Sequence, residues 1–412
     1  YILIILCCLT SFPLWSYNVN MIVEHYSVDQ GLPNNTVNCT LKDRDGFIWF
    51  GTWYGLCCFD GVKFKTFNKQ EHDSDVPPRK IQRIVEDKNG YIWVKTIDRK
   101  LYVFNKVTEC FHAVYDDMKN YSENIQVIKL QNTAEGDVLL LTKDKNLLLA
   151  GVDEKGQVTI KILFDSRDEI NKHDYTLKHH VLCETEEYIS WIGTDYKVSA
   201  VHKGAELASR PADFITSKIN SGDKDSFTSF FEDGRKVWVG DRAGIFYSID
   251  VRTGLVNRYV LSEIKGAISN LLVTPAGYVY LSVTGQGTYE YDLAERRLQK
   301  INTEMNDAMV THAFIDQYDK IWFHENEKAL IYYDPLNHTA KRFPFTMFGK
   351  ITTLYSEDAG ERGLFFLSPA GEAWLFDREH AEMVYINKLK QLSNDRANQQ
   401  FYHLMLDNDG VL

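Results

Sequence analysis

The chain has 412 residues, which exceeds the size that one hydrophobic core usually serves, so it should form several units or one large repeat array. Aromatic residues make up 13% of it, proline is sparse, and no long helical periodicity stands out. The formal net charge of −11 argues against nucleic-acid contacts in this segment.

The first segment, residues 1–17, is apolar and contains no charged residue. It is too short to cross a bilayer comfortably. It matches the hydrophobic region of a secretory signal peptide whose front end is missing. We therefore expect the protein to be exported.

A recurring phrase fills the rest of the chain. Its clearest copies are Asp43-Arg-Asp-Gly-Phe-Ile-Trp49 and Asp87-Lys-Asn-Gly-Tyr-Ile-Trp93. Tryptophan occupies the same position in five copies: Trp49, Trp93, Trp191, Trp238 and Trp322. Leu139, Tyr280 and Phe366 fill that position in three others. A spacing of about 42 to 52 residues is typical of four-stranded blades, so the sequence predicts an all-β propeller.

The first copy shows how one blade is built. The runs 36–41, 47–50, 56–59 and 62–67 are rich in β-branched and aromatic residues, and turns with Gly or Asp separate them. This pattern predicts a meander of four antiparallel strands. A lone sheet of this kind leaves both faces wet, whereas stacked blades bury them, with the Trp of the second strand between neighbours.

Seven copies complete one ring, which predicts a seven-bladed β-propeller over residues 21–338. We expect strand 21–26 to close the ring as the outer strand of the seventh blade, beside residues 329–333. The segment 339–345 is then displaced, and residues 339–412 begin a second, incomplete propeller.

The motifs of catalysis and metal binding are missing. The Asp-x-Asp-Gly turns resemble the opening of a calcium loop but lack the glutamate required at its twelfth position. The group His179-His180-x-x-Cys183 lacks further zinc ligands. There is no phosphate-binding glycine loop, nucleophile elbow or HExxH pair. We therefore expect no catalytic residue, no metal and no cofactor in this segment.

The first copy resembles the two-component regulator propeller repeat. The resemblance rests on Tyr26-Ser-Val-Asp-Gln-Gly-Leu-Pro-Asn-Asn-Thr-Val37, on Asp45-Gly-Phe-Ile-Trp-Phe-Gly-Thr52 and on Gly55-Leu-x-x-Phe59-Asp-Gly61. Such repeats build the extracytoplasmic sensor of hybrid two-component systems in Bacteroides-type bacteria. One departure is Lys95, which replaces the usual Gly before Thr96.

The resemblance implies further properties of the whole protein. A membrane span, a histidine kinase, a receiver and a DNA-binding domain would follow residue 412. The segment would then be periplasmic, tethered to the inner membrane, and paired as a homodimer through the full-length protein. The kinase chemistry would lie outside this segment, which is not itself expected to be an enzyme.

The ligand face of a propeller carries the turns between second and third strands together with the connections between blades. Aromatic rings beside carboxylate, guanidinium and amide groups suit sugar recognition, because rings cover C–H faces and polar groups fix hydroxyls. The candidate ligand-binding residues in these turns are Trp53, Tyr54, Arg99, Asp195, Tyr196, Arg242, Gln286 and Asn326.

The sequence therefore predicts the ligand-sensing region of a hybrid sensor histidine kinase. It would detect a carbohydrate or glycan fragment and pass a conformational signal across the membrane. Two alternatives stay open. One is a secreted propeller lyase or glycosidase, with His, Asp or Glu side chains converging on the same face. The other is a non-catalytic interaction scaffold.

Overall fold

The computed structural model describes residues 26–67, 77–119, 126–143, 146–164, 182–185, 187–192, 197–204, 214–218, 227–301, 310–325, 328–348, 355–358, 363–368 and 370–388. These residues form thirty-two strands, the four-residue helix α1 (Tyr115–Met118) and two short 3-10 turns, Val28–Gln30 and Phe345–Phe348. No helix among them is long and apolar enough to cross a membrane. The predicted signal segment 1–17 and the group at His179 and His180 lie outside the described residues.

The strands form eight four-stranded antiparallel sheets, each in simple chain order. The first sheet contains β1 (Val37–Lys42), β2 (Ile48–Thr52), β3 (Gly55–Phe59) and β4 (Phe64–Phe67), and the second contains β5 (Ile81–Glu86), β6 (Ile92–Thr96), β7 (Leu101–Asn105) and β8 (Cys110–Ala113). The third sheet contains β9 (Val127–Asn132), β10 (Val138–Thr142), β11 (Leu147–Val152) and β12 (Val158–Phe164). The fourth sheet contains β13 (Leu182–Glu184), β14 (Tyr188–Ile192), β15 (Lys197–His202) and β16 (Phe214–Lys218).

The remaining four sheets follow the same plan. They are β17 (Phe227–Glu232), β18 (Lys236–Asp241), β19 (Ile245–Asp250) and β20 (Leu255–Val260); β21 (Ile268–Val273), β22 (Tyr278–Val283), β23 (Gly287–Asp292) and β24 (Arg297–Lys300); β25 (Val310–Ile315), β26 (Ile321–Glu325), β27 (Ala329–Asp334) and β28 (Thr339–Pro344); and β29 (Tyr355–Asp358), β30 (Leu364–Leu367), β31 (Glu372–Asp377) and β32 (Glu382–Lys388). The fold is the predicted all-β propeller.

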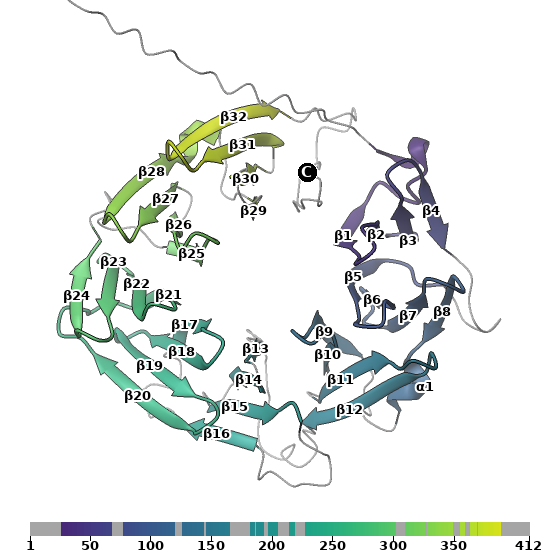
Figure 1. Ribbon diagram of the computed structural model, residues 1–412, viewed down its shortest axis with the longest axis horizontal. Coiled ribbons are helices and arrows are strands. Elements are labelled where there is room, and N and C mark those ends of the chain that lie inside the picture. Colours follow the sequence, from purple (N-terminus) through teal and green to yellow (C-terminus); the bar gives the residue numbers. More distant parts are fainter. Residues whose placement is uncertain are drawn as a thin grey trace, which may run out of the picture. The chain divides into compact units, whose positions relative to one another are not determined.

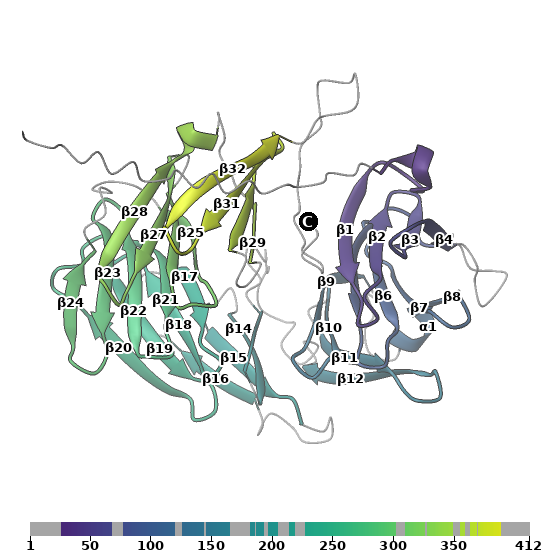
Figure 2. The same ribbon diagram turned by 45° about the horizontal axis from the view of Figure 1, so that its top comes forward.

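The sheets divide between two compact units. The first seven sheets belong to the unit of Tyr26–Thr352 and the eighth to the unit of Thr353–Leu404. In the larger unit consecutive sheets lie side by side in chain order, with the first strand of each innermost and the fourth outermost (Figures 1 and 2). That the eighth sheet opens a second propeller stays a prediction.

The repeated Trp position lies on the second strand of every sheet, as predicted. Each consecutive pair among the first seven sheets shares one hydrophobic cluster. Trp49 packs in the cluster that joins the first two sheets, and Leu139 and Tyr280 hold the same place in later ones. The large side chain therefore fills the space between neighbouring blades.

A buried hydrogen bond explains why Asp precedes Trp in the repeat. The Asp carboxylate accepts backbone N–H groups of its own turn with one oxygen and the indole N–H with the other. The Nε1···Oδ2 distances are 2.8 Å for Trp49 and Asp43, 2.9 Å for Trp93 and Asp87, 2.7 Å for Trp238 and Asp233, and 3.3 Å for Trp322 and Asp316. The turn and the inter-blade side chain are thus oriented by the same group.

The predicted displacement of residues 339–345 is wrong. Strand β28 pairs with β27 in unbroken register, from Ala329 opposite Pro344 to Asp334 opposite Thr339. It takes the outer position that we assigned to strand 21–26. Asp334 Oδ1 accepts Leu336 N–H at 3.0 Å and stabilises the short turn between β27 and β28. Closing this short turn costs less conformational entropy than bringing in a strand from the other end of the chain. Residues 21–25 lie outside the described residues.

Candidate ligand site

The turns between second and third strands are tied to the connections between sheets. Lys80 N–H donates to the Trp53 carbonyl, and Ile97 N–H donates to the Lys80 carbonyl, both at 2.9 Å. Val127 N–H donates to the Arg99 carbonyl at 3.0 Å. In the first three sheets these turns and connections therefore lie at one end, as predicted, and we call this the turn end.

Trp53 and Tyr54 form the turn between β2 and β3. The two residues are 40% and 64% exposed, and neither belongs to the hydrophobic cluster between the first two sheets. The Lys80 ammonium lies over the Trp53 ring, 5.2 Å from its centroid. The rings therefore present aromatic surface next to a cation instead of packing into the next blade.

The next turn, between β6 and β7, adds a basic and an apolar group. Ile97 is exposed, and Arg99 adopts a left-handed backbone with φ 68°. Its guanidinium Nη1 lies 3.5 Å from Gln126 Oε1. Burial opposes ionisation of Asp98, but a threonine hydroxyl and the charge of Lys100 outweigh it and lower the pKa of Asp98. Asp98 therefore remains an anion paired within its own turn.

The other predicted residues fall on different sheets. Arg242 is exposed in the turn between β18 and β19. Gln286 lies between β22 and β23, where its Oε1 accepts Lys265 N–H at 2.7 Å and its Nε2 donates to the Glu263 carbonyl at 2.9 Å. The Gln286 amide thus ties its turn to the connection entering the same sheet. Asp195, Tyr196 and Asn326 lie outside the described residues.

The structure adds two basic residues that were not among the candidates. Arg83 on β5 lies directly opposite Lys95 on β6. Lys95 is only 6% exposed, and its Nζ donates to Gln82 Oε1 at 2.5 Å. Burial, reinforced by the charge of Arg99, lowers the pKa of Lys95. The sequence signal was the replacement of the usual Gly by Lys95.

Glycine has a clear reason at the equivalent position of the first sheet. A Cβ on Gly51 would lie 2.5 Å from Cys39 Sγ of the same sheet and 2.5 Å from Ile81 Cγ2 of the second sheet. Close packing of the next blade therefore requires Gly there. Lys95 lies where its own blade faces the third sheet and puts a charged side chain into the equivalent space.

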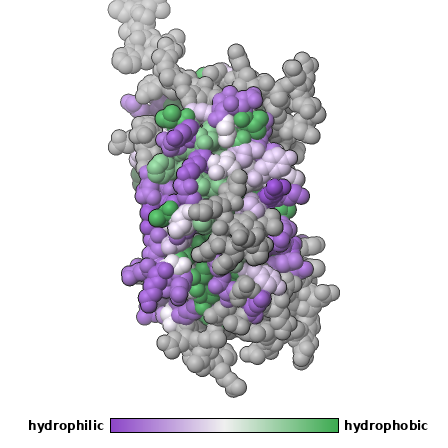
Figure 3. All heavy atoms as spheres, turned by 90° about the vertical axis from the view of Figure 1, so that its right-hand side faces the viewer, coloured by the Kyte–Doolittle hydropathy of each residue, from purple (hydrophilic) through white to green (hydrophobic). Residues whose placement is uncertain are grey.

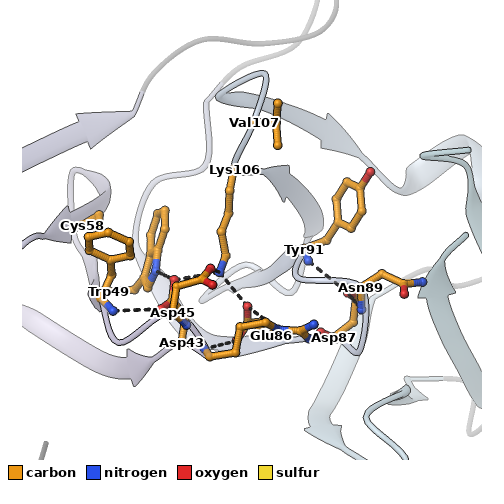
Figure 4. Close-up of polar contacts among 12 residues, drawn as sticks. Asp43, Asp45, Trp49, Cys58, Glu86, Asp87, Asn89, Tyr91, Lys106 and Val107 are labelled. Atoms are coloured by element: carbon orange, nitrogen blue, oxygen red, sulfur yellow. Dashed lines mark hydrogen bonds and ion pairs between the residues drawn. The ribbon is translucent and has the colours of Figure 1, made fainter. Parts of the chain in front are cut away.

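Three carboxylates at the opposite end of the first two sheets have the spacing of a metal site. One oxygen from each of Asp43, Asp45 and Glu86 lies within 4.8 Å of the others. The Lys106 ammonium lies among them, at 2.7, 3.2 and 2.6 Å (Figure 4). Burial alone would lower the pKa of Lys106, but these partners raise it. The cluster is a salt bridge that clamps one sheet to the next.

The same clamp recurs between the third and fourth sheets. Lys203 Nζ lies 2.8 Å from Glu135 and 2.6 Å from Glu184. Lys203 follows β15 as Lys106 follows β7, and Glu184 ends β13 as Glu86 ends β5.

The outer side of the first two sheets, where β4 and β8 lie, is mainly hydrophilic with apolar side chains interspersed (Figure 3).

Sequence comparison identifies the repeat. Residues 31–54, which include the exposed Trp53 and Tyr54, match the family model described as two component regulator propeller. The resemblance found in the sequence is thereby confirmed. No curated protein matches the chain in sequence.

Solved structures resemble this chain at low identity. The Dos1 propeller is 13% identical, with 81% of this chain and 90% of that chain covered and a TM-score of 0.50. The extracellular domain of the putative hybrid two component system BT3049 from B. thetaiotaomicron is 15% identical, covers 89% of this chain and 55% of its own, and has a TM-score of 0.37. Virginiamycin B lyase from Staphylococcus aureus is 11% identical, with 73% and 94% covered and a TM-score of 0.40. The chain thus spans 55% of the length of the BT3049 domain.

Proposed function

We propose that this chain is part of the extracytoplasmic ligand-sensing region of a two-component system and that its ligand is a carbohydrate. The observation that carries the proposal is the exposed pair Trp53 and Tyr54 inside the matched repeat, at the end where turns and connections meet. Aromatic rings cover the apolar face of a sugar, and Lys80 and Arg99 nearby supply hydrogen-bond donors to its hydroxyls.

The proposed mechanism is a change of geometry without chemistry in this segment. A ligand that binds one arrangement of the sensor more tightly than another shifts the population toward it. In a homodimer tethered to the inner membrane, that shift would alter the spacing of the two membrane spans and so the activity of a kinase beyond residue 412.

Binding is tested by calorimetric titration of the purified chain with a panel of neutral and acidic oligosaccharides. A ligand that contacts the turn should lose about tenfold in affinity or more in Trp53→Ala and Tyr54→Ala. Tyr115→Ala is the matched control, because Tyr115 is an equally exposed aromatic residue on α1. Chromatography of each ligand after incubation should recover it unchanged; a cleaved product would support the lyase or glycosidase alternative. Equal affinities in all variants, or no binding by any oligosaccharide, would refute the proposal.

A further inference from the structure

The described residues at the turn end of the second sheet are strongly basic, although the chain as a whole is acidic. The charges come from the connection before β5, from the facing strands β5 and β6, and from the turn that follows β6: Arg79, Lys80, Arg83, Lys95, Arg99 and Lys100. Asp98 is the carboxylate of that turn, and it pairs with Lys100, with its Oδ2 3.5 Å from the ammonium. Among the described residues of this end, the other cations therefore exceed the anions.

Two other lysines with little exposure in the described part of the chain, Lys106 and Lys203, have carboxylate partners. The side chains of Lys106 and Lys203 are 18% and 12% exposed, and each ammonium contacts at least two carboxylates. Lys95 is more buried than either, yet in the described part of the chain its hydrogen bond is to the neutral carboxamide of Gln82. A buried charge without a counter-charge is costly, because solvation is lost and no ion pair replaces it.

The facing residue increases that cost. Residues directly opposite in an antiparallel pair lie on the same face of the sheet, and like charges there repel each other. Arg83 and Lys95 are such a pair. Arg83 is exposed and forms no ion pair within the described ranges, and Arg99 adds a third positive charge close by. No carboxylate in the described part of the chain pairs with these three cations, so the group is suited to receive an anion.

We propose that Arg83, Lys95 and Arg99 bind an anionic group, the carboxylate or sulfate ester of an acidic oligosaccharide. The inference rests on the function proposed above and names its ligand class. The exposed side chain of Gln82, on β5, offers an oxygen to Lys95 where the anion would bind. Guanidinium groups match carboxylate and sulfate oxygens with paired donors, and the ammonium adds a point charge in a site of low dielectric.

The test uses the purified chain at fixed ionic strength with three probes: trigalacturonate, the neutral galactotriose of the same linkage, and sodium sulfate. We expect trigalacturonate to bind wild type at least tenfold more tightly than galactotriose, and Lys95→Met to remove about that factor, as for the loss of one charged hydrogen bond. Arg83→Gln should act in the same direction. Lys63→Met, at an exposed lysine in the turn between β3 and β4, is the matched control and should bind like wild type.

Thermal unfolding separates a binding role from a structural one. Lys95→Met exchanges an uncompensated buried charge for an apolar side chain of similar shape, so its unfolding midpoint should equal or exceed that of wild type. A lower midpoint with unchanged trigalacturonate binding would overturn the proposal. Sulfate that binds and is lost in Lys95→Met indicates a sulfate ester as the anion, and trigalacturonate binding without sulfate binding indicates a carboxylate.

The outcomes also separate this inference from the sensor proposal. Galactotriose that binds as tightly as trigalacturonate would overturn the anion site while leaving a carbohydrate sensor in place. If none of these probes binds, the anion site is overturned, and the sensor proposal is then judged on its wider panel of oligosaccharides.

Discussion

Replacement of Asp87 by alanine tests how far one carboxylate holds a blade together. Its Oδ1 accepts the backbone N–H groups of Asn89 and Tyr91 at 2.9 and 3.0 Å. Its Oδ2 accepts Trp93 Nε1–H at 2.9 Å and the N–H of Val152 in the next sheet at 3.3 Å. Asp87 is 1% exposed, so Asp87→Ala leaves the indole and the Val152 amide without acceptors in a dry environment.

Each buried donor left without a partner costs about 1–3 kcal/mol, so we expect Asp87→Ala to lower the free energy of unfolding by about 3–5 kcal/mol. The assay is urea unfolding followed by tryptophan fluorescence, with the midpoint as the measured quantity. Asp60→Ala is the control, because Asp60 caps the Val62 and Lys63 amides in an exposed turn where water can replace it. Equal midpoint shifts in the two variants would refute the reasoning.

Three further variants test the packing and the charges. Lys106→Met should lower the free energy of unfolding by about 1–2 kcal/mol at pH 7. The ion pair with Lys106 lowers the pKa of Asp43 despite burial, so its stabilising effect is present above about pH 4 and is lost as the pH falls further. The unfolding midpoints of the variant and wild type should therefore converge in acid. Gly51→Ala should cost about 1–3 kcal/mol by thermal unfolding, since its methyl would lie 2.5 Å from two neighbouring side-chain atoms; an unchanged midpoint would contradict the packing argument. Tyr280→Phe removes the hydroxyl that donates to buried Glu290 at 3.0 Å and should lower the free energy of unfolding by about 1–3 kcal/mol. The same change should cost less when Glu290 is already Gln. A double-mutant cycle measures this difference.

The parts of the fold that sequence reasoning predicted are local. Each blade is a run of hairpins within about 50 residues, and its turns carry Asp and Gly at positions that the backbone requires. Gly46, for example, has φ 91°, and the Asp43 carboxylate accepts the amides of its turn. Strand order in the first six sheets, the second-strand position of Trp and the all-β class therefore follow from short-range pattern alone.

The candidate site was predicted only in part. Trp53 and Tyr54 could be found because the turn that exposes them is part of the repeat itself. Gln286 belongs to the same class of turn, but its amide is used by the backbone of an incoming connection, which no spacing in the sequence reveals.

The sequence by itself determined the blade, its turns and the aromatic residue that separates it from its neighbour. Only the tertiary structure decided which strand completes the seventh sheet, which lysines have carboxylate partners and which do not. Lys106 reaches Asp43 across 63 positions, whereas Lys95 faces Arg83 across a strand pair. The two lysines thus differ in their partners. Contacts between repeats depend on how the blades stack, whereas the pattern within a repeat depends only on neighbours along the chain.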